Sequence, residues 1–269
     1  MDLQVEYDNR ARVPGHPAII AGWQRDAAAF RAAWAEAECD IPYGPGAREK
    51  LDLFRPGPGL DWPVALFIHG GYWQALDRGF VSHLARGMLA RGVAVAVPSY
   101  DLCPQARLAD IIDQMRAAAR LLHRRTGRRL LATGHSAGGH MAAMLMATDW
   151  RALDPLLPAD LVPAGLPISG VFELEPLLPT TIGAGLRLAP AEARALSPRY
   201  LPSPGLPLHA VVGGAESGEF LRQTRDFAAA WGGTAEVLPG EDHFTILAPL
   251  ADPDSALSRR TAAMALAIG

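Results

Sequence analysis

Short apolar runs alternate with longer amphipathic stretches along most of the chain. Glycine, proline or polar residues bound most of these runs, and the runs from residue 64 onward lack the strict alternation of polar and apolar positions that a strand with one solvent-exposed face would show. Such runs are typical of strands covered by helices on both faces, which predicts a mostly parallel sheet in an α/β fold. The predicted strands are residues 51–54, 64–68, 93–97, a run that begins at 130, and 166–170, 206–212 and 235–238.

Helices are predicted between these strands. The stretch 108–125 is the clearest, because its apolar residues recur at three- and four-residue spacing along one face. Similar stretches predict helices over 79–91, 219–231 and 255–268. Residues 149–163 form a proline-rich connection, and the proline-rich stretch 174–204 predicts an irregular excursion over the strand ends.

The first fifty residues differ from the rest of the chain. A helix predicted over residues 18–38 carries Trp23, Phe30 and Trp34 at near-helical spacing, and a loop is expected over 41–46. An aromatic stripe of this kind either packs on the core or covers an active site, and both roles are compatible. Since no internal repeat or linker separates this segment from the remainder, residues 1–269 are predicted as a single domain with an N-terminal helical segment, a partial cap, near the active site.

Composition narrows the class of protein. The chain of 269 residues is 49% hydrophobic and 20% charged, with a formal net charge of −3. These values indicate a globular protein with no tendency to bind nucleic acid or an anionic membrane. Cys39 and Cys103 form no motif with each other or with nearby histidines, so neither a disulfide framework nor a thiolate metal site is predicted. With no signal-peptide pattern and no membrane-spanning apolar run, we expect a cytoplasmic protein.

A candidate nucleophile lies where the predicted strand from Leu130 meets an alanine- and methionine-rich helix. The turn reads Gly134-His135-Ser136-Ala137-Gly138, which is G-x-S-x-G between a strand and a helix. This nucleophile elbow needs small residues on both sides of the serine, so that strand and helix approach closely while the hydroxyl points into a cleft. A glycine-rich turn with a capping serine is the structural alternative. The context favours Ser136 as a nucleophile.

A serine nucleophile needs a base and an acid, which on this architecture follow it in the order serine, acid, histidine. His243 lies in a polar loop after the last predicted strand, at the sheet edge where α/β proteins bind ligands, and is the predicted base. His209 lies within an apolar strand and is interpreted as a core histidine. Asp242 is expected to support the loop of His243.

Two carboxylates compete for the role of the acid. Glu216 stands in the loop after the strand that ends at Val212, and Glu219 begins the next helix, where a carboxylate also complements the helix dipole. The loop position favours Glu216, with Glu219 as the alternative.

The loop His69-Gly70-Gly71-Tyr72-Trp73 follows the predicted strand 64–68 and matches the H-G-G type that supplies oxyanion donors. The alternative is a tight turn without a catalytic role. The predicted oxyanion hole comprises Gly70, Gly71, Tyr72 and Ala137. The predicted substrate pocket is lined by His69, Tyr72, Trp73 and His135.

No cofactor is predicted. The sequence contains no H-E-x-x-H, no P-loop and no G-x-G-x-x-G after the first strand, and the histidines around the elbow are expected to point different ways. The predicted partner is a small-molecule substrate, with no metal, nucleic acid or membrane. The assembly state stays open, with a homodimer among the alternatives.

With these motifs in place, the chain resembles the α/β-hydrolase superfamily and, within it, the kynurenine formamidase (arylformamidase) branch, which is close to the hormone-sensitive-lipase-like esterases. The narrower resemblance rests on the H-G-G-Y-W loop and on Glu6-Tyr7-Asp8-Asn9-Arg10, Tyr43-Gly44 before Leu51-Asp52-Leu53-Phe54, and Gly218-Glu219-Phe220-Leu221-Arg222-Gln223. The chain departs from the family where Glu216 stands, since formamidases of this type usually have aspartate there.

The resemblance implies a metal-independent serine hydrolase that converts N-formylkynurenine to kynurenine and formate. A short-chain carboxylesterase is the alternative within the hydrolases, because the same catalytic groups serve both bonds. A non-catalytic hydrolase fold that binds a ligand or partner is the alternative from another class.

Overall fold

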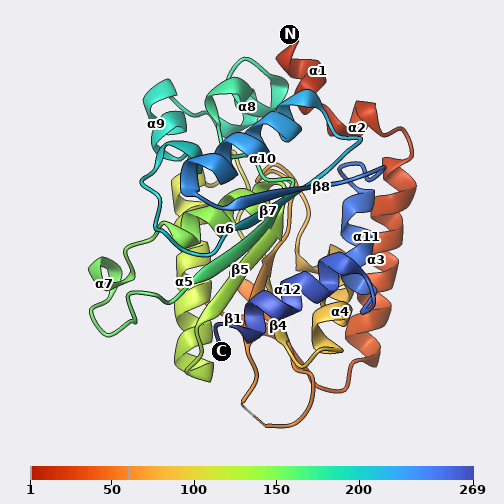
Figure 1. The fold of residues 1–269 in the computed structure, drawn as a ribbon, viewed down its shortest axis with the longest axis vertical. Coiled ribbons are helices and arrows are strands. Elements are labelled where there is room, and N and C mark those ends of the chain that lie inside the picture. Colours follow the sequence, from red (N-terminus) through yellow and green to blue (C-terminus); the bar gives the residue numbers. More distant parts are fainter. Residues whose placement is uncertain (1, 60) are drawn as a thin grey trace.

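The computed structural model describes residues 2–59 and 61–269. Figure 1 shows the fold. Within these residues, eight strands form one sheet in the order β1-β2-β4-β3-β5-β6-β7-β8. Strand β2 is antiparallel to both of its neighbours, and the pairs from β4 to β8 are parallel. The strands are β1 (Ala37–Pro42), β2 (Lys50–Phe54), β3 (Val64–Ile68), β4 (Ala94–Pro98), β5 (Leu130–His135), β6 (Ala164–Ile168), β7 (His209–Gly213) and β8 (Thr234–Leu238). The predicted mostly parallel α/β sheet is confirmed.

Helices flank the sheet on both faces. The α-helices are α1 (Leu3–Tyr7), α2 (Asn9–Arg12), α3 (His16–Ala33), α4 (Arg86–Leu89), α5 (Leu108–Thr126), α6 (Ala137–Met146), α7 (Trp150–Leu153), α8 (Thr181–Leu186), α9 (Pro190–Ala195), α10 (Gly218–Trp231), α11 (Ala248–Ala251) and α12 (Ala256–Leu266). Short 3-10 turns are η1 (Arg78–Phe80), η2 (Ser82–Ala85), η3 (Glu175–Leu177), η4 (Pro198–Tyr200) and η5 (Thr245–Leu247).

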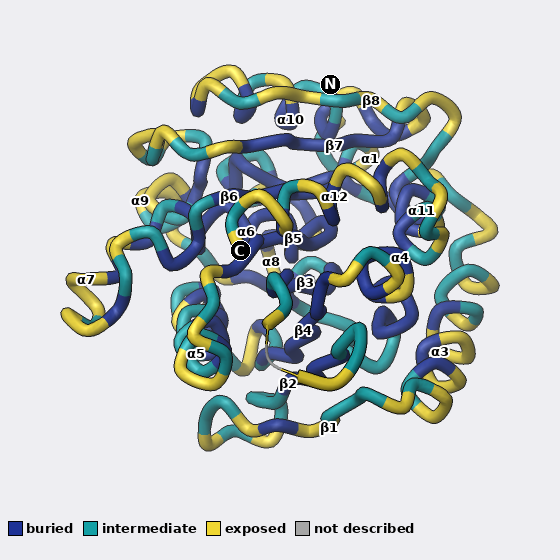
Figure 2. The backbone as a smooth tube through the Cα atoms, turned by 60° about the horizontal axis from the view of Figure 1, so that its bottom comes forward, coloured by how far each residue is buried: buried dark blue, intermediate teal, exposed yellow. Residues whose placement is uncertain are grey.

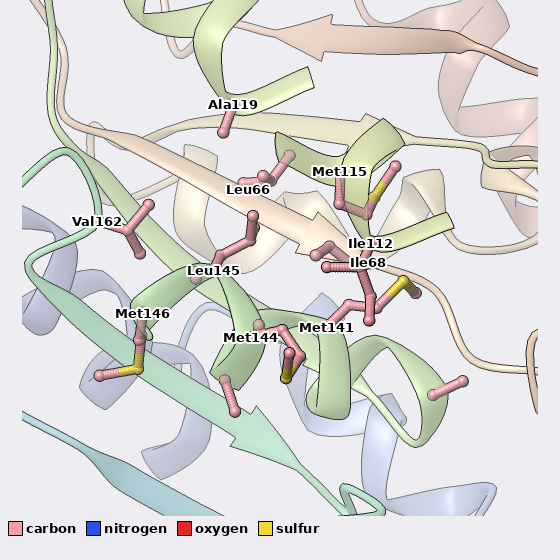
Figure 3. Packing of buried hydrophobic residues seen from close by; sticks show 14 of the residues in the cluster. Leu66, Ile68, Ile112, Met115, Ala119, Met141, Met144, Leu145, Met146 and Val162 are labelled. Carbon is pink, nitrogen blue, oxygen red and sulfur yellow. The ribbon is translucent and has the colours of Figure 1, made fainter. Parts of the chain in front are cut away.

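Alternate residues of β3 enter two separate core layers. Leu66 and Ile68 belong to a core cluster that includes residues of α5, α6 and α10, whereas Ala65 and Phe67 belong to a cluster that includes residues of α3, α4 and α12. Every residue of this strand is buried, which explains why its sequence is apolar without alternation. Figure 3 shows the α6 side of the first layer, and Figure 2 shows the buried strands enclosed by helices whose outer faces are exposed.

Three local predictions are wrong. The helix predicted to reach residue 38 ends at Ala33, and residues 37–42, partly expected as a loop, form the edge strand β1. That strand is largely exposed and has no apolar run. It forms by pairing with β2 at the edge of the sheet, so its own sequence does not show the pattern of a buried strand. The connection predicted over 149–163 is present and includes the short helix α7, whereas the helix predicted over 79–91 is broken into η1, η2 and α4. Glycines in residues 79–91 weaken a continuous helix.

The N-terminal segment lies against the body of the fold. Helix α3 buries Trp23, Ala27 and Phe30, of which Trp23 and Phe30 pack in the second core layer. The aromatic stripe is therefore a packing face, and Trp23 also lines a cavity that contains Ser136. Helix α1 contacts α10 and η3 on the other side of the sheet (Figure 1). No helix in the described ranges is long and apolar enough to cross a membrane.

Candidate active site

Ser136 sits in the turn between β5 and α6 with φ 56° and ψ −116°. This conformation is unfavourable for a residue with a Cβ, and it is held by the hydrogen bond from the Ser136 amide to the Ile168 carbonyl at 2.9 Å. A Cβ on Gly138 would overlap the carbonyl oxygen of Ile68, so the helix can pass this close to β3 only with glycine at that position. The elbow geometry predicted for the G-x-S-x-G turn is present.

His243 and Glu216 form a buried pair beyond the carboxyl ends of β8 and β7. The Nδ1 atom of His243 lies 2.6 Å from Oε2 of Glu216, and both side chains are almost completely buried. Since a carboxylate only accepts hydrogen bonds, Nδ1 carries the proton and Nε2 presents a lone pair. His243 is therefore arranged to accept a proton, and Glu216 to stabilise the imidazolium that results.

The second oxygen of Glu216 is also held. Its Oε1 accepts hydrogen bonds from the hydroxyl of Ser169 at 2.5 Å and from the amide of Gly213 at 2.8 Å. Ser169 directly follows β6 and has φ 49°. Ser169 was not predicted from the sequence as a site residue, although its place at the carboxyl end of a predicted strand was a signal that it lies at this edge of the sheet.

Glu219 has a different set of contacts. It accepts a hydrogen bond from the hydroxyl of Tyr7 at 2.8 Å and pairs with Arg222 at 2.8 Å. These hydrogen bonds, with that from Arg222 the largest cause, hold the pKa of Glu219 below its ordinary value. Within the described chain, the structure thus brings Glu216 and not Glu219 to His243.

The other polar residues considered from the sequence have structural contacts. Asp242 accepts hydrogen bonds from the amides of Phe244 and Thr245, as expected for a residue that supports the loop. His209 lies between Thr234 and Glu236, at 2.6 and 2.7 Å, and belongs to the β7–β8 pair rather than to the site.

The loop after β3 has a left-handed backbone. Gly71 has φ 106° and Tyr72 has φ 51°. Among the described residues, the amides of Gly71, Tyr72 and Ala137 donate no hydrogen bond to the protein. Amides of this kind are the expected donors to a developing oxyanion. The amide of Gly70, also predicted for the oxyanion hole, donates no hydrogen bond within the described chain either, and a Cβ on Gly70 would come within 3.1 Å of the Ser136 Cβ.

A cavity of about 440 Å³ opens over these groups. Ser136, His243, His135 and Tyr72 contribute to its wall, and so do residues of α1, α2 and α3. The ring centre of His135 lies 4.6 Å from that of His243. Burial, followed by the nearby His243, holds the pKa of His135 well below its ordinary value, so His135 is neutral at pH 7.

Two predicted pocket residues are wrong. His69 is fully buried and stacks on Tyr100 with ring centres 4.1 Å apart, and burial lowers its pKa to about 4. Trp73 is also fully buried and packs edge-on against His140. The left-handed turn at residues 71–73 sends the Tyr72 side chain to the cavity wall and the Trp73 side chain into the core.

Two of the stretches that carried the family resemblance, the one around Tyr7 and the start of α10, meet in space. The hydroxyl of Tyr7 accepts a hydrogen bond from Gln223 at 2.5 Å, in addition to donating to Glu219. The amide of Glu219 donates to the carboxylate of Glu6 at 3.0 Å. The ring of Phe220, in the same turn of α10, packs against that of His243 at 4.7 Å. This contact connects the N-terminal segment to the candidate base. No group of metal-binding side chains that could hold an ion occurs within residues 2–59 and 61–269.

Sequence comparisons show which known proteins this chain is similar to. The family model BD-FAE matches residues 51–156. The kynurenine formamidase of Salmo salar is 30% identical over 242 residues, covering 84% of this chain and 81% of that protein.

Solved structures give the same fold. A protein from Silicibacter sp. TM1040, provisionally described as a thioesterase, superimposes with a TM-score of 0.87 at 35% identity and covers 96% of this chain and 98% of its own. Esterase B from Lactobacillus rhamnosis superimposes with a TM-score of 0.71 at 20% identity over 98% of this chain and 94% of its own, and supports the fold alone.

Proposed function

The chain belongs to the kynurenine formamidase family of α/β-hydrolases, and we propose that it hydrolyses the formamide bond of N-formylkynurenine, releasing kynurenine and formate. The observation that carries the chemistry is the 2.6 Å hydrogen bond between His243 and Glu216, in a site that shares one cavity with Ser136. This bond fixes the imidazole tautomer that a serine hydrolase requires.

In the first half of the proposed reaction, the Ser136 oxygen attacks the formyl carbon while its proton passes to Nε2 of His243. The amides of Gly71, Tyr72 and Ala137 donate hydrogen bonds to the oxyanion of the tetrahedral intermediate. When the intermediate collapses, the bond between carbon and nitrogen breaks, and the His243 imidazolium gives its proton to the departing aromatic amine.

In the second half, water attacks the formyl ester on Ser136 and gives a proton to His243. The ester bond then breaks, the Ser136 oxygen regains that proton, and formate leaves. A formyl group occupies little space, so most of the 440 Å³ cavity is available to the amine that leaves.

Aromatic side chains at the cavity wall suit an aromatic amine. Trp23 and Phe244 lie with ring centres 6.0 Å apart, and Tyr72 faces the same cavity. Flat apolar rings provide contact area for an aryl ketone at little cost in conformational entropy. This wall supports the formanilide over an alkyl amide.

Short-chain ester hydrolysis is the second candidate, because the same nucleophile, base and oxyanion donors cleave a carboxylic ester. The esterase LipQ of Mycobacterium tuberculosis is 34% identical over 156 residues, 52% of this chain, and this likeness supports the ester candidate.

The test compares kcat/KM for N-formyl-L-kynurenine and for p-nitrophenyl acetate, with and without EDTA. A preference for the formamide that survives EDTA supports the proposal. Ester turnover without deformylation would refute the formamidase assignment and leave an esterase. Absence of both activities, together with binding of an aromatic ligand, would favour a binding protein.

A further inference from the structure

Asp8, Asn9 and Arg10 line the cavity that contains Ser136. They belong to the N-terminal segment, at the junction of α1 and α2. None of them takes part in the reaction steps proposed above, yet together they bring one anionic group, one amide and one cationic group to the same wall.

In the side-chain amide of Asn9, the nitrogen Nδ2 makes a hydrogen bond and the oxygen Oδ1 makes none within the described chain. Tyr72 donates its hydroxyl proton to the carbonyl of Tyr7 at 2.8 Å, so the Tyr72 oxygen can only accept from Asn9, which lies 3.2 Å away through Nδ2. This assigns the amide orientation, because the opposite one would place two acceptors together.

The other end, Oδ1 of Asn9, accepts no hydrogen bond within the described chain, although the residue is only 3% exposed. A buried acceptor without a donor is costly and in native proteins is usually satisfied by a ligand or water. Since Asn9 is one of the residues that line the cavity, a ligand bound there can supply the missing donor.

The flanking residues carry charges. Arg10 is exposed, and none of its nitrogens forms an ion pair with a carboxylate of the described residues, whereas many other arginines of this protein do. Asp8 uses Oδ1 to cap the amide of Ala11, and Oδ2 makes no hydrogen bond in the same described part of the chain. The cavity lining therefore includes a guanidinium without an ion pair and a carboxylate oxygen without a hydrogen bond, within the described residues.

We propose that this stretch, named here the N-terminal subsite (Asp8, Asn9 and Arg10), binds the zwitterionic α-amino-acid end of the substrate. Arg10 binds the carboxylate, and Asn9 Oδ1 together with Asp8 binds the ammonium group. The inference rests on the proposed function, because kynurenine is an aromatic amine that carries an α-amino acid. It assigns to the N-terminal segment the selection of the leaving group, separate from bond cleavage.

The primary test uses Arg10→Gln, with Arg12→Gln as the matched control. Arg12 lies on the same short helix and is also exposed, but it does not line the cavity. The substrates are N-formyl-L-kynurenine, N-formylkynuramine, which lacks the carboxylate, and p-nitrophenyl acetate.

Arg10→Gln is expected to lower kcat/KM for N-formyl-L-kynurenine by about tenfold, mainly through KM, because a charge-assisted pair is lost at an exposed rim. The same variant should leave N-formylkynuramine and p-nitrophenyl acetate within about twofold of wild type, and Arg12→Gln should change none of the three. Equal effects of Arg10→Gln on N-formyl-L-kynurenine and N-formylkynuramine, or no effect on either, would overturn the role of Arg10.

A second arm tests Asn9 with the substrate analogue that lacks the ammonium group. Asn9→Leu should reduce the preference for N-formyl-L-kynurenine over this deamino analogue, with p-nitrophenyl acetate hydrolysis reporting on the integrity of the site. An unchanged preference, or an equal loss on all three substrates, would overturn the role of Asn9.

A third measurement separates this inference from the proposed function. L-kynurenine and kynuramine are compared as competitive inhibitors of p-nitrophenyl acetate hydrolysis in wild type and Arg10→Gln. Stronger inhibition by L-kynurenine that depends on Arg10 supports the subsite even when N-formyl-L-kynurenine is not deformylated. Deformylation with no such difference would support the function and refute the subsite.

Discussion

Replacing Glu216 by glutamine keeps the size of the side chain but exchanges one carboxylate oxygen for an NH₂ donor, although every hydrogen-bonding neighbour of the carboxylate is itself a donor. In the native protein, Oε2 accepts from His243, and Oε1 accepts from Ser169 and from the Gly213 main chain. The Gly213 N–H group cannot reverse its polarity, so the glutamine carbonyl is expected to face it. The amide NH₂ then faces Nδ1 of His243 and forces the proton onto Nε2.

This tautomer cannot accept the proton of Ser136. The rotated amide would restore the tautomer only by placing NH₂ against the Gly213 N–H group, at a cost of about 1–3 kcal/mol, and it would still lack the charge that stabilises the imidazolium. In serine proteases, an asparagine in place of the triad aspartate lowers kcat by about 10⁴ through the same change of tautomer. We therefore expect kcat of Glu216→Gln to fall by about 10³–10⁴, equivalent to about 4–5.5 kcal/mol of transition-state stabilisation.

The assay is kcat at saturating substrate, with thermal unfolding followed by circular dichroism to show that the variant is folded. Glu219→Gln is the matched control. It removes a carboxylate of the same size three positions further along the chain, and kcat should stay within about threefold of wild type because the Glu216 bond to His243 remains. Glu216→Asp keeps the negative charge on a side chain that is one methylene shorter. Its kcat should lie between those of wild type and Glu216→Gln.

A folded Glu216→Gln variant with kcat within tenfold of wild type would refute this reasoning. If kcat of Glu219→Gln instead fell by about 10³-fold, Glu219 would be the acid, and the role assigned to the His243–Glu216 pair would be wrong.

Tyr7→Phe should lower the free energy of unfolding by about 1.5–3 kcal/mol, because Glu219 loses a buried donor; equal urea midpoints for variant and wild type would contradict this. Gly138→Ala should abolish folded protein, as judged by circular dichroism, because its Cβ would overlap the main chain of β3; a native spectrum would contradict the packing. Burial lowers the pKa of His69 and of His140 to about 4. Since the unfolded chain binds these protons near pH 6.5, their contribution to stability is complete above that pH. It is lost as the pH falls toward 4, by about 1.4 kcal/mol per histidine per pH unit. Urea unfolding at pH 7 and pH 5 checks the sign, and a protein equally stable at both values would contradict it.

Local patterns predicted the parts of the site that depend on local structure. The strand, turn and helix around Ser136 are contiguous, so the G-x-S-x-G spacing determined their arrangement. His243 and Glu216 each follow a predicted strand. Because parallel strands have their carboxyl ends on the same side of the sheet, the two residues were expected to lie close together. The choice of Glu216 over Glu219 followed from the same argument, since a residue in the loop lies nearer the strand end than one in the next helix.

Side-chain direction within the H-G-G-Y-W loop could not be predicted in this way. Tyr72 and Trp73 are adjacent and both aromatic, yet consecutive positive φ values turn one toward the cavity and the other into the core. Contacts between segments that are far apart in the sequence could not be predicted either. Tyr7 meets Glu219 across 212 positions of the chain, and nothing in the local pattern of either stretch indicates the other.

The central claim is that Ser136 is the nucleophile, and covalent labelling tests it most directly. Wild-type protein and Ser136→Ala are incubated with a fluorophosphonate, digested and analysed by mass spectrometry. We expect one phosphonyl group per wild-type chain on the peptide that contains Ser136, no label on Ser136→Ala, and loss of hydrolysis in proportion to labelling. A wild-type protein that is not labelled, or a Ser136→Ala variant that retains both label and activity, would contradict the claim.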